Sequence, residues 1–84
     1  MVDKIVLKKW VVDALVALGG TGTIVDVGKH IWEHHEDDLR GSGDMFYTWQ
    51  YDIRWAKQQL RDSGILEEPK SSGKGVWRLT SRRG

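Results

Sequence analysis

Apolar residues recur at helical spacing in the first part of the chain. The first stripe, with spacings of four, three and four, consists of Leu7, Val11, Ala14 and Leu18. Because one face of a helix repeats about every 3.6 residues, this stripe predicts a helix over residues 4–18, which Gly19-Gly20 then end. A second stripe consists of Ile24, Val27 and Ile31. Thr23 and Asp26 stand at its start with the spacing of a capping box, so it predicts a short helix over residues 24–35.

The middle of the chain holds an aperiodic stretch and then the strongest helical pattern. Residues 36–44 contain four acids and two glycines and predict an exposed, mobile acidic loop. The third stripe consists of Trp49, Ile53, Ala56 and Leu60. It predicts a helix over residues 48–62, with Asp44 as an alternative start and Ser63-Gly64 as its end. At about 80° to 140° from this stripe on a helical wheel lies a polar, basic ridge of Gln50, Arg54, Lys57 and Arg61.

Two short runs of β-forming residues follow. Residues 65–66 and 76–80 are each typical of a strand, and the segment between them, 67–75, holds the only proline and several small polar residues. This arrangement predicts a hairpin with a long basic tip. Three helices followed by a two-stranded hairpin give an α+β fold in the order of a winged helix-turn-helix domain. The chain of 84 residues has room for one domain, residues 1–84.

The amino-acid composition excludes several classes of protein. The absence of cysteine excludes disulfide frameworks, cysteine-based zinc fingers and thiol catalysis. The longest apolar stretch, 11–18, is far shorter than the roughly 20 residues of a membrane span, and residues 1–9 lack a signal-peptide core. We therefore expect a cytoplasmic protein with no membrane partner. Residues 26–44 carry six acids and two bases, whereas residues 45–84 carry eight bases and four acids, so the basic surface belongs to the C-terminal half.

Three segments of the C-terminal half are similar to a known family. They are Ile53-Arg54-Trp55-Ala56, Gln59-Leu60-Arg61-Asp62-Ser63-Gly64-Ile65-Leu66 and Gly75-Val76-Trp77-Arg78-Leu79-Thr80. With residues 15–20 and 27–31 matching the first two helices, the chain resembles the N-terminal winged-helix module of Mrr-type restriction proteins. The resemblance implies DNA binding in a restriction-modification system or in transcription regulation. It implies no cleavage, because the family's nuclease portion is absent here. Asp52 stands where relatives often carry a basic residue, which argues against a DNA contact there.

The third helix and the hairpin tip supply the candidate DNA-binding residues. Arginine and lysine can contact guanine or phosphate, glutamine can pair with adenine, and hydroxyl groups can bind phosphate oxygens. On the helix the candidates are Thr48, Gln50, Tyr51, Arg54, Lys57 and Gln58. On the tip they are Lys70, Ser71, Ser72 and Lys74. For both sets the alternative is an ordinary solvated surface. Tyr51, which is out of phase with the apolar stripe, is also a candidate for contact with a methylated or extruded base.

Other patterns are weaker. His30 and His34 are one helical turn apart, a spacing that can hold a metal ion, but no second cluster supplies further ligands. We therefore expect no metal and no cofactor. No carboxylate pair, Ser/His/Asp set or phosphate-binding glycine loop indicates an enzyme.

The sequence thus predicts a module that binds double-stranded DNA, with the helix 48–62 in the major groove and the wing 67–75 on the backbone. Reading of methylated DNA is the narrower form of this hypothesis. The competing hypothesis is a winged-helix domain that contacts a partner protein, or a second copy of itself, through its acidic loop and aromatic surface. Salt-dependent binding to duplex DNA separates the two.

Overall fold

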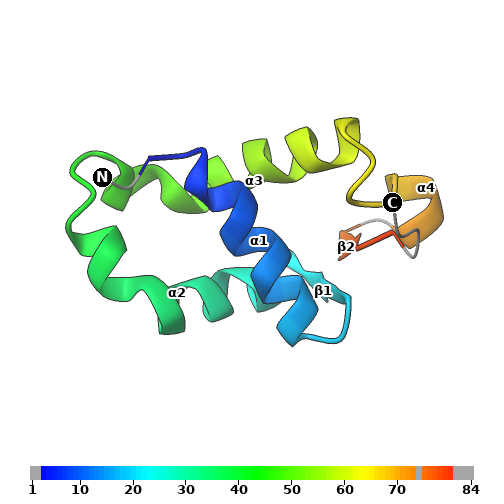
Figure 1. Cartoon of the computed structure of the whole chain (residues 1–84), viewed down its shortest axis with the longest axis horizontal. Coiled ribbons are helices and arrows are strands. Elements are labelled where there is room, and N and C mark those ends of the chain that lie inside the picture. The colour runs from blue at the N-terminus through cyan, green and yellow to red at the C-terminus, as the bar shows by residue number, and fades with distance from the viewer. Residues whose placement is uncertain (1–2, 74, 81–84) are drawn as a thin grey trace.

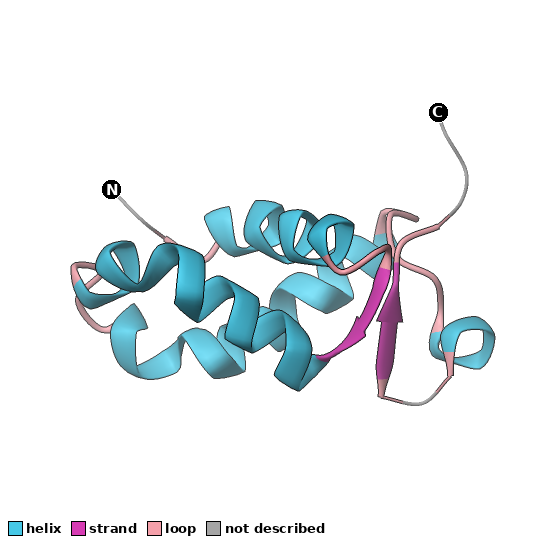
Figure 2. Cartoon of the chain, turned by 90° about the horizontal axis from the view of Figure 1, so that it is seen from below, coloured by secondary structure: helices cyan, strands magenta, loops and turns pink. Residues whose placement is uncertain are grey.

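Three helices pack against one another, and a small sheet lies at one end of the bundle (Figures 1 and 2). The computed structural model describes residues 3–73 and 75–80. In chain order the elements are α1 (Val6–Ala17), β1 (Thr21–Thr23), α2 (Ile24–Arg40), α3 (Met45–Asp62), α4 (Pro69–Ser72) and β2 (Val76–Arg78). They form a small α+β domain with three long helices and a two-stranded antiparallel sheet, compatible with a winged-helix layout. Within the described ranges no helix is long and apolar enough to cross a membrane.

The predicted apolar stripes form most of the core. Every member of the third stripe is buried, and so is the first stripe except Leu18, which caps the end of α1 and is exposed. From the second stripe, Val27 and Ile31 are fully buried, while Ile24 is only partly buried. The core consists of Leu7, Trp10, Val11, Ala14, Leu15, Val27, Ile31, Leu39, Met45, Trp49, Ile53, Ala56, Leu60, Leu66 and Trp77.

Helix α2 begins as predicted but continues further. The Thr23 side chain accepts a hydrogen bond from the Asp26 amide at 3.2 Å, and the Asp26 carboxylate accepts one from the Thr23 amide at 3.1 Å, which completes the capping box. The predicted loop 36–44 is wrong for residues 36–40, which are helical. A kink at His35, with φ −133° and ψ 21°, turns the last part of α2 so that Leu39 is fully buried. Burial of that leucine is the physical reason for the longer helix.

Helix α3 starts at Met45, next to the alternative start Asp44 and three residues before the predicted position 48. The additional turn is held by Met45, which is buried in the core. The turn between α2 and α3 is therefore short, and it contains two glycines at positions 41 and 43.

The sheet differs from the predicted hairpin. Strand β2 pairs antiparallel with β1, with Gly22 opposite Trp77, and the sequence pattern missed β1 entirely. The predicted partner 65–66 forms an isolated bridge between Leu66 and Leu79. Backbone hydrogen bonds flank it, from the Glu67 amide to the Arg78 carbonyl at 2.8 Å and from the Thr80 amide to the Ile65 carbonyl at 3.0 Å. The predicted open tip contains a single helical turn, α4. The wing is thus a short pairing at its base with a helical turn at its tip.

Candidate nucleic-acid interface

The outward face of α3 carries several of the predicted DNA-binding side chains. Gln50, Tyr51, Arg54 and Gln58 are all exposed, and 75% of Tyr51 is accessible to solvent. Tyr47, one turn before Tyr51, is 83% exposed and extends the same face, although sequence reasoning did not select it. The signal was available, because positions 47, 51, 54 and 58 have the spacing of one helix face.

Two of the predicted residues already have carboxylate partners on α3. The Thr48 hydroxyl donates a hydrogen bond to the Asp52 carboxylate at 2.8 Å, and the Gln58 amide donates one to Asp62 at 3.0 Å. Thr48 would have to give up this bond to donate to a phosphate, whereas Gln58 keeps a second N–H and its amide carbonyl for other partners. Arg54, in contrast, has no carboxylate within ion-pair distance in the part of the chain that the structure describes.

The C-terminal half of the predicted basic ridge faces the wing. Lys57 is partly buried, with its Nζ atom 5.8 Å from the centre of the Trp77 ring. Burial lowers the pKa of Lys57, and the nearby charges of Arg61 and Arg54 lower it further. The Arg61 guanidinium donates hydrogen bonds to the Glu67 carbonyl at 3.1 Å and to the Val76 carbonyl at 3.4 Å. These two cations therefore connect α3 to Glu67 and to strand β2, and Lys57 is less accessible than Arg54.

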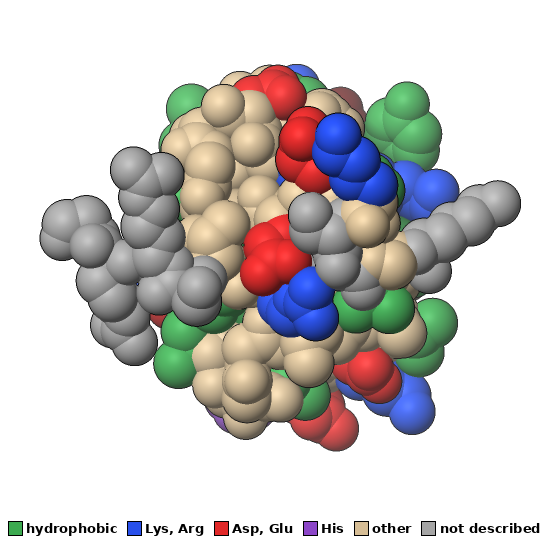
Figure 3. Space-filling view, turned by 90° about the vertical axis from the view of Figure 1, so that its right-hand side faces the viewer, with side chains coloured by type: hydrophobic (Ala, Val, Ile, Leu, Met, Phe, Trp, Pro, Cys, Tyr) green, Lys and Arg blue, Asp and Glu red, His purple; other side chains and the backbone are tan. Residues whose placement is uncertain are grey.

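The wing presents its charges in a mixed pattern. Lys70 is exposed on α4. The backbone of Ser71 and Ser72 completes that helical turn, and the predicted contact Lys74 lies outside the described residues. At the wing base, Arg78 donates a 2.8 Å hydrogen bond to the Glu67 carboxylate, which raises the pKa of the guanidinium. Figure 3 looks onto this end of the molecule, where the acidic and basic side chains of the described residues are interspersed.

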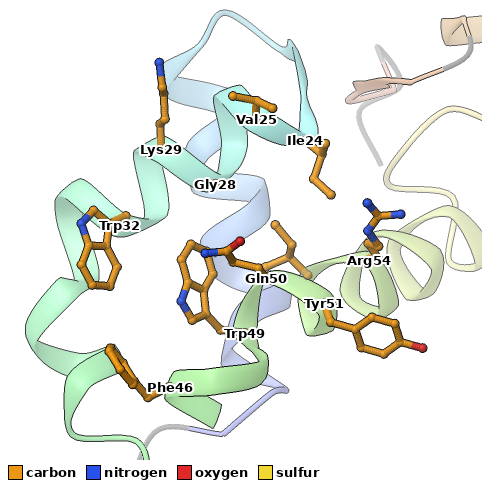
Figure 4. A pocket seen from close by; sticks show the side chains of 11 residues that line it. Ile24, Val25, Gly28, Lys29, Trp32, Phe46, Trp49, Gln50, Tyr51 and Arg54 are labelled. Carbon is orange, nitrogen blue, oxygen red and sulfur yellow. The ribbon is translucent and has the colours of Figure 1, made fainter.

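A groove of about 830 Å³ lies between α2 and α3 (Figure 4). Its apolar lining is formed by Ile24, Val25, Trp32, Phe46, Trp49 and Ile53. Its polar lining is formed by Lys29, Gln50, Tyr51 and Arg54, so both of its charged side chains are cations. Gln50 and Arg54 are directed from α3 toward α2, while Tyr51 points outward.

Two exposed residues on α2 belong to this surface and were missed from the sequence. They are Lys29 and Val25, which lie across the groove from α3. The candidate interface therefore combines the first half of α2 with residues 46–54 of α3. Nothing in the one-dimensional pattern of α2 distinguishes Lys29 from an ordinary surface lysine.

The histidines of α2 form stacked pairs. The rings of His30 and His34 stack with centres 4.0 Å apart, and His34 Nδ1 lies 2.9 Å from the His30 carbonyl. No cluster of three or more potential metal ligands occurs among the described residues. His35 stacks on Trp10 at 3.9 Å, and burial lowers the pKa of His35 despite the nearby Asp38 carboxylate.

Comparisons with protein-family models, with curated proteins and with solved structures found no match to this chain.

Proposed function

We propose that the chain is a winged-helix module that binds double-stranded DNA. In this proposal α3 enters the major groove and the wing, residues 67–75, lies along the sugar-phosphate backbone. The observation that carries the proposal is the surface formed by Gln50, Tyr51 and Arg54 with Lys29 opposite, because it offers amide and guanidinium donors beside an aromatic ring. Arginine and glutamine are side chains that can form two hydrogen bonds with a base edge in the major groove.

The resemblance to Mrr-type N-terminal modules suggests a narrower role in reading methylated DNA, within a defence or regulatory system. Exposed Val25 and Tyr51 support this extension, because an apolar side chain can contact a methyl group that projects into the major groove. The test is a comparison of methylated and unmethylated duplexes of one sequence. Equal affinity would restrict the proposal to general DNA binding.

The primary test measures affinity for a duplex by fluorescence anisotropy over a series of salt concentrations. Affinity should fall steeply with salt, because bound phosphates release counterions. Arg54→Ala should weaken binding by about 1 to 3 kcal/mol if the guanidinium contacts a base. The matched control is Lys9→Ala, which removes one positive charge from α1, where Lys9 is paired with Asp13 at 2.9 Å. Equal effects of the two variants would remove Arg54 from the site.

The wing is tested separately. The double variant Lys70→Ala/Lys74→Ala should weaken binding to all sequences alike and flatten the salt dependence by about two units, if both lysines contact phosphate. A loss confined to one DNA sequence would contradict a backbone role for the wing.

The alternative function is contact with a partner protein or a second copy of the chain. The observation that favours it is the exposed aromatic surface of Tyr47 and Tyr51 beside the apolar groove. A stable protein complex, together with no DNA binding at low salt, would replace the DNA proposal with this one.

A further inference from the structure

The groove between α2 and α3 is larger than the reading of base edges requires. Side chains that read a duplex contact the edges of stacked bases, so a flat helix surface with a few projecting donors is sufficient. Here the groove has a volume of about 830 Å³. That volume lies within the roughly 300–1,000 Å³ of sites that enclose a small organic molecule. The size of the groove therefore indicates that it accepts a whole chemical group and not only a methyl substituent.

The lining indicates the chemistry of that group. Trp32 and Phe46 are partly buried and supply aromatic surface, while Ile24 and Val25 add aliphatic surface from the start of α2. Gln50 can both donate and accept hydrogen bonds. Among the described residues that line the groove, the charged side chains are Lys29 and Arg54, and none is a carboxylate. A planar, partly apolar group attached to an anion is complementary to this combination.

We infer that the groove accommodates one unpaired nucleotide of bound DNA. The inference rests on the proposed DNA-binding function and deepens it. The base would pack against the aromatic and aliphatic wall, Gln50 would bond to its edge, and Arg54 would contact an adjoining phosphate. The Lys29 side chain extends away from α3 (Figure 4) and is not needed for this contact. Because Gln50 and Arg54 also lie on the proposed DNA-facing surface of α3, a nucleotide could enter the groove without a second DNA-binding face.

The energetics determine which DNA should be preferred. Unstacking a paired base has a cost comparable to the gain from stacking it on an aromatic side chain, so the groove alone would not open an intact duplex. A nucleotide that is already unpaired avoids that cost. Stacking on one aromatic side chain changes affinity on the order of tenfold. The protein should therefore bind a duplex with one bulged nucleotide about tenfold more tightly than the intact duplex.

Gly28 provides a way to close the groove without disturbing the core. It lies in the groove wall, and a Cβ atom added there would meet no heavy atom within 4 Å. Leucine also favours helix more than glycine does, so Gly28→Leu should fold and place its side chain in the groove. Gly28→Ala is the matched control, because it gives a similar benefit to the helix and leaves most of the groove open.

The experiment compares three DNAs of one sequence by fluorescence anisotropy: the intact duplex, the duplex with one bulged deoxyadenosine, and the duplex with a bulged abasic residue. Wild type and Gly28→Ala should prefer the bulged base about tenfold over both other DNAs. Gly28→Leu should lose this preference and bind the three DNAs with equal affinity. Circular dichroism establishes that each variant is folded.

The outcomes distinguish this inference from the proposed function. If the abasic bulge binds as tightly as the base bulge, the protein recognises bent DNA and the inference is wrong. If all three DNAs bind equally, the groove has another occupant, such as an apolar peptide, although DNA binding stands. If none of the DNAs binds, both proposals are wrong. A second measurement needs no variant and uses the fluorescent base 2-aminopurine as the bulged nucleotide. Its fluorescence should be quenched when the protein binds, because the base stacks in the groove. Unchanged fluorescence would overturn the inference.

Discussion

Truncation of two aromatic side chains on α3 should have opposite consequences for stability. Trp49 is only 5% exposed, and its ring lies parallel to that of Trp32 with centres 6.2 Å apart. A buried large aromatic removes roughly 150–250 Å² from water, which at about 25 cal/mol per Å² corresponds to roughly 4–6 kcal/mol. Residual burial in the unfolded chain reduces this value, so Trp49→Ala should cost about 3–5 kcal/mol. Tyr51 is 75% exposed, and Tyr51→Ala should change the free energy of unfolding by less than about 0.5 kcal/mol.

The assay is urea denaturation followed by far-ultraviolet circular dichroism, which reports on the helices and does not depend on the mutated ring. A domain of this length has a total stability of about 4–13 kcal/mol, so Trp49→Ala removes a large part of it. A loss of about 3 kcal/mol corresponds to a decrease of roughly 12–24 °C in melting temperature. If Tyr51→Ala unfolds the domain while Trp49→Ala does not, α3 is rotated relative to the core and the residues proposed to contact DNA must be reassigned.

Three further changes test local features of the fold by urea denaturation. Thr23→Ala should lower the free energy of unfolding by about 0.5–2 kcal/mol, because it removes the capping box of α2. Thr23→Ser keeps a hydroxyl and should retain most of the stability. Equal losses in the two variants would contradict the capping role. Gly64→Ala should destabilise by about 1–2 kcal/mol because φ is +82° there, whereas Gly28→Ala, in a helix, should stabilise by about 0.5–1 kcal/mol. Burial lowers the pKa of His35 below the ordinary value of about 6.5, so the unfolded chain binds the proton more tightly than the folded chain does. The contribution of His35 to the free energy of unfolding should therefore be complete above that pH. It should decrease as the pH falls toward the pKa of the folded state. His35→Phe, which keeps a ring against Trp10, should lose less stability than wild type between pH 7.5 and 5.5, and identical losses would exclude His35 as a contributor.

Helix positions and burial were predictable where local pattern and tertiary structure agree. The stripes identified α1 and α3, and Thr23 with Asp26 identified the start of α2. The extension of α2 had a signal, because His35 and Leu39 continue the spacing of Ile31 by four residues each. Acidic neighbours obscured that signal, and the kink that brings Leu39 onto the core depends on contacts such as that of His35 with Trp10.

The sheet and the groove could not be predicted in the same way. Strand β1 is Thr21-Gly22-Thr23, which has no apolar alternation and forms a strand by pairing with β2, more than 50 residues later. Similarly, Lys29 belongs to the candidate site only because the packing of α2 against α3 leaves a groove between the two helices. Pairings and angles between distant elements are not encoded in the periodicity of either element alone.

The roles of the basic residues on α3 depend on what covers them, which a helical wheel does not specify. Arg54, Lys57 and Arg61 share one ridge on the wheel, yet of these three only Arg54 is exposed, while the other two are partly buried. The Lys57 ammonium lies over the Trp77 ring. The Arg61 guanidinium donates hydrogen bonds to the backbone carbonyls of Glu67 and Val76. Under the proposed function, contact from α3 is therefore expected mainly from residues 50–54, beside the groove between α2 and α3. In the proposed complex with DNA, the exposed face of α3 and residues 67–75 should therefore approach the duplex together, because two hydrogen bonds from Arg61 join α3 to Glu67 and Val76.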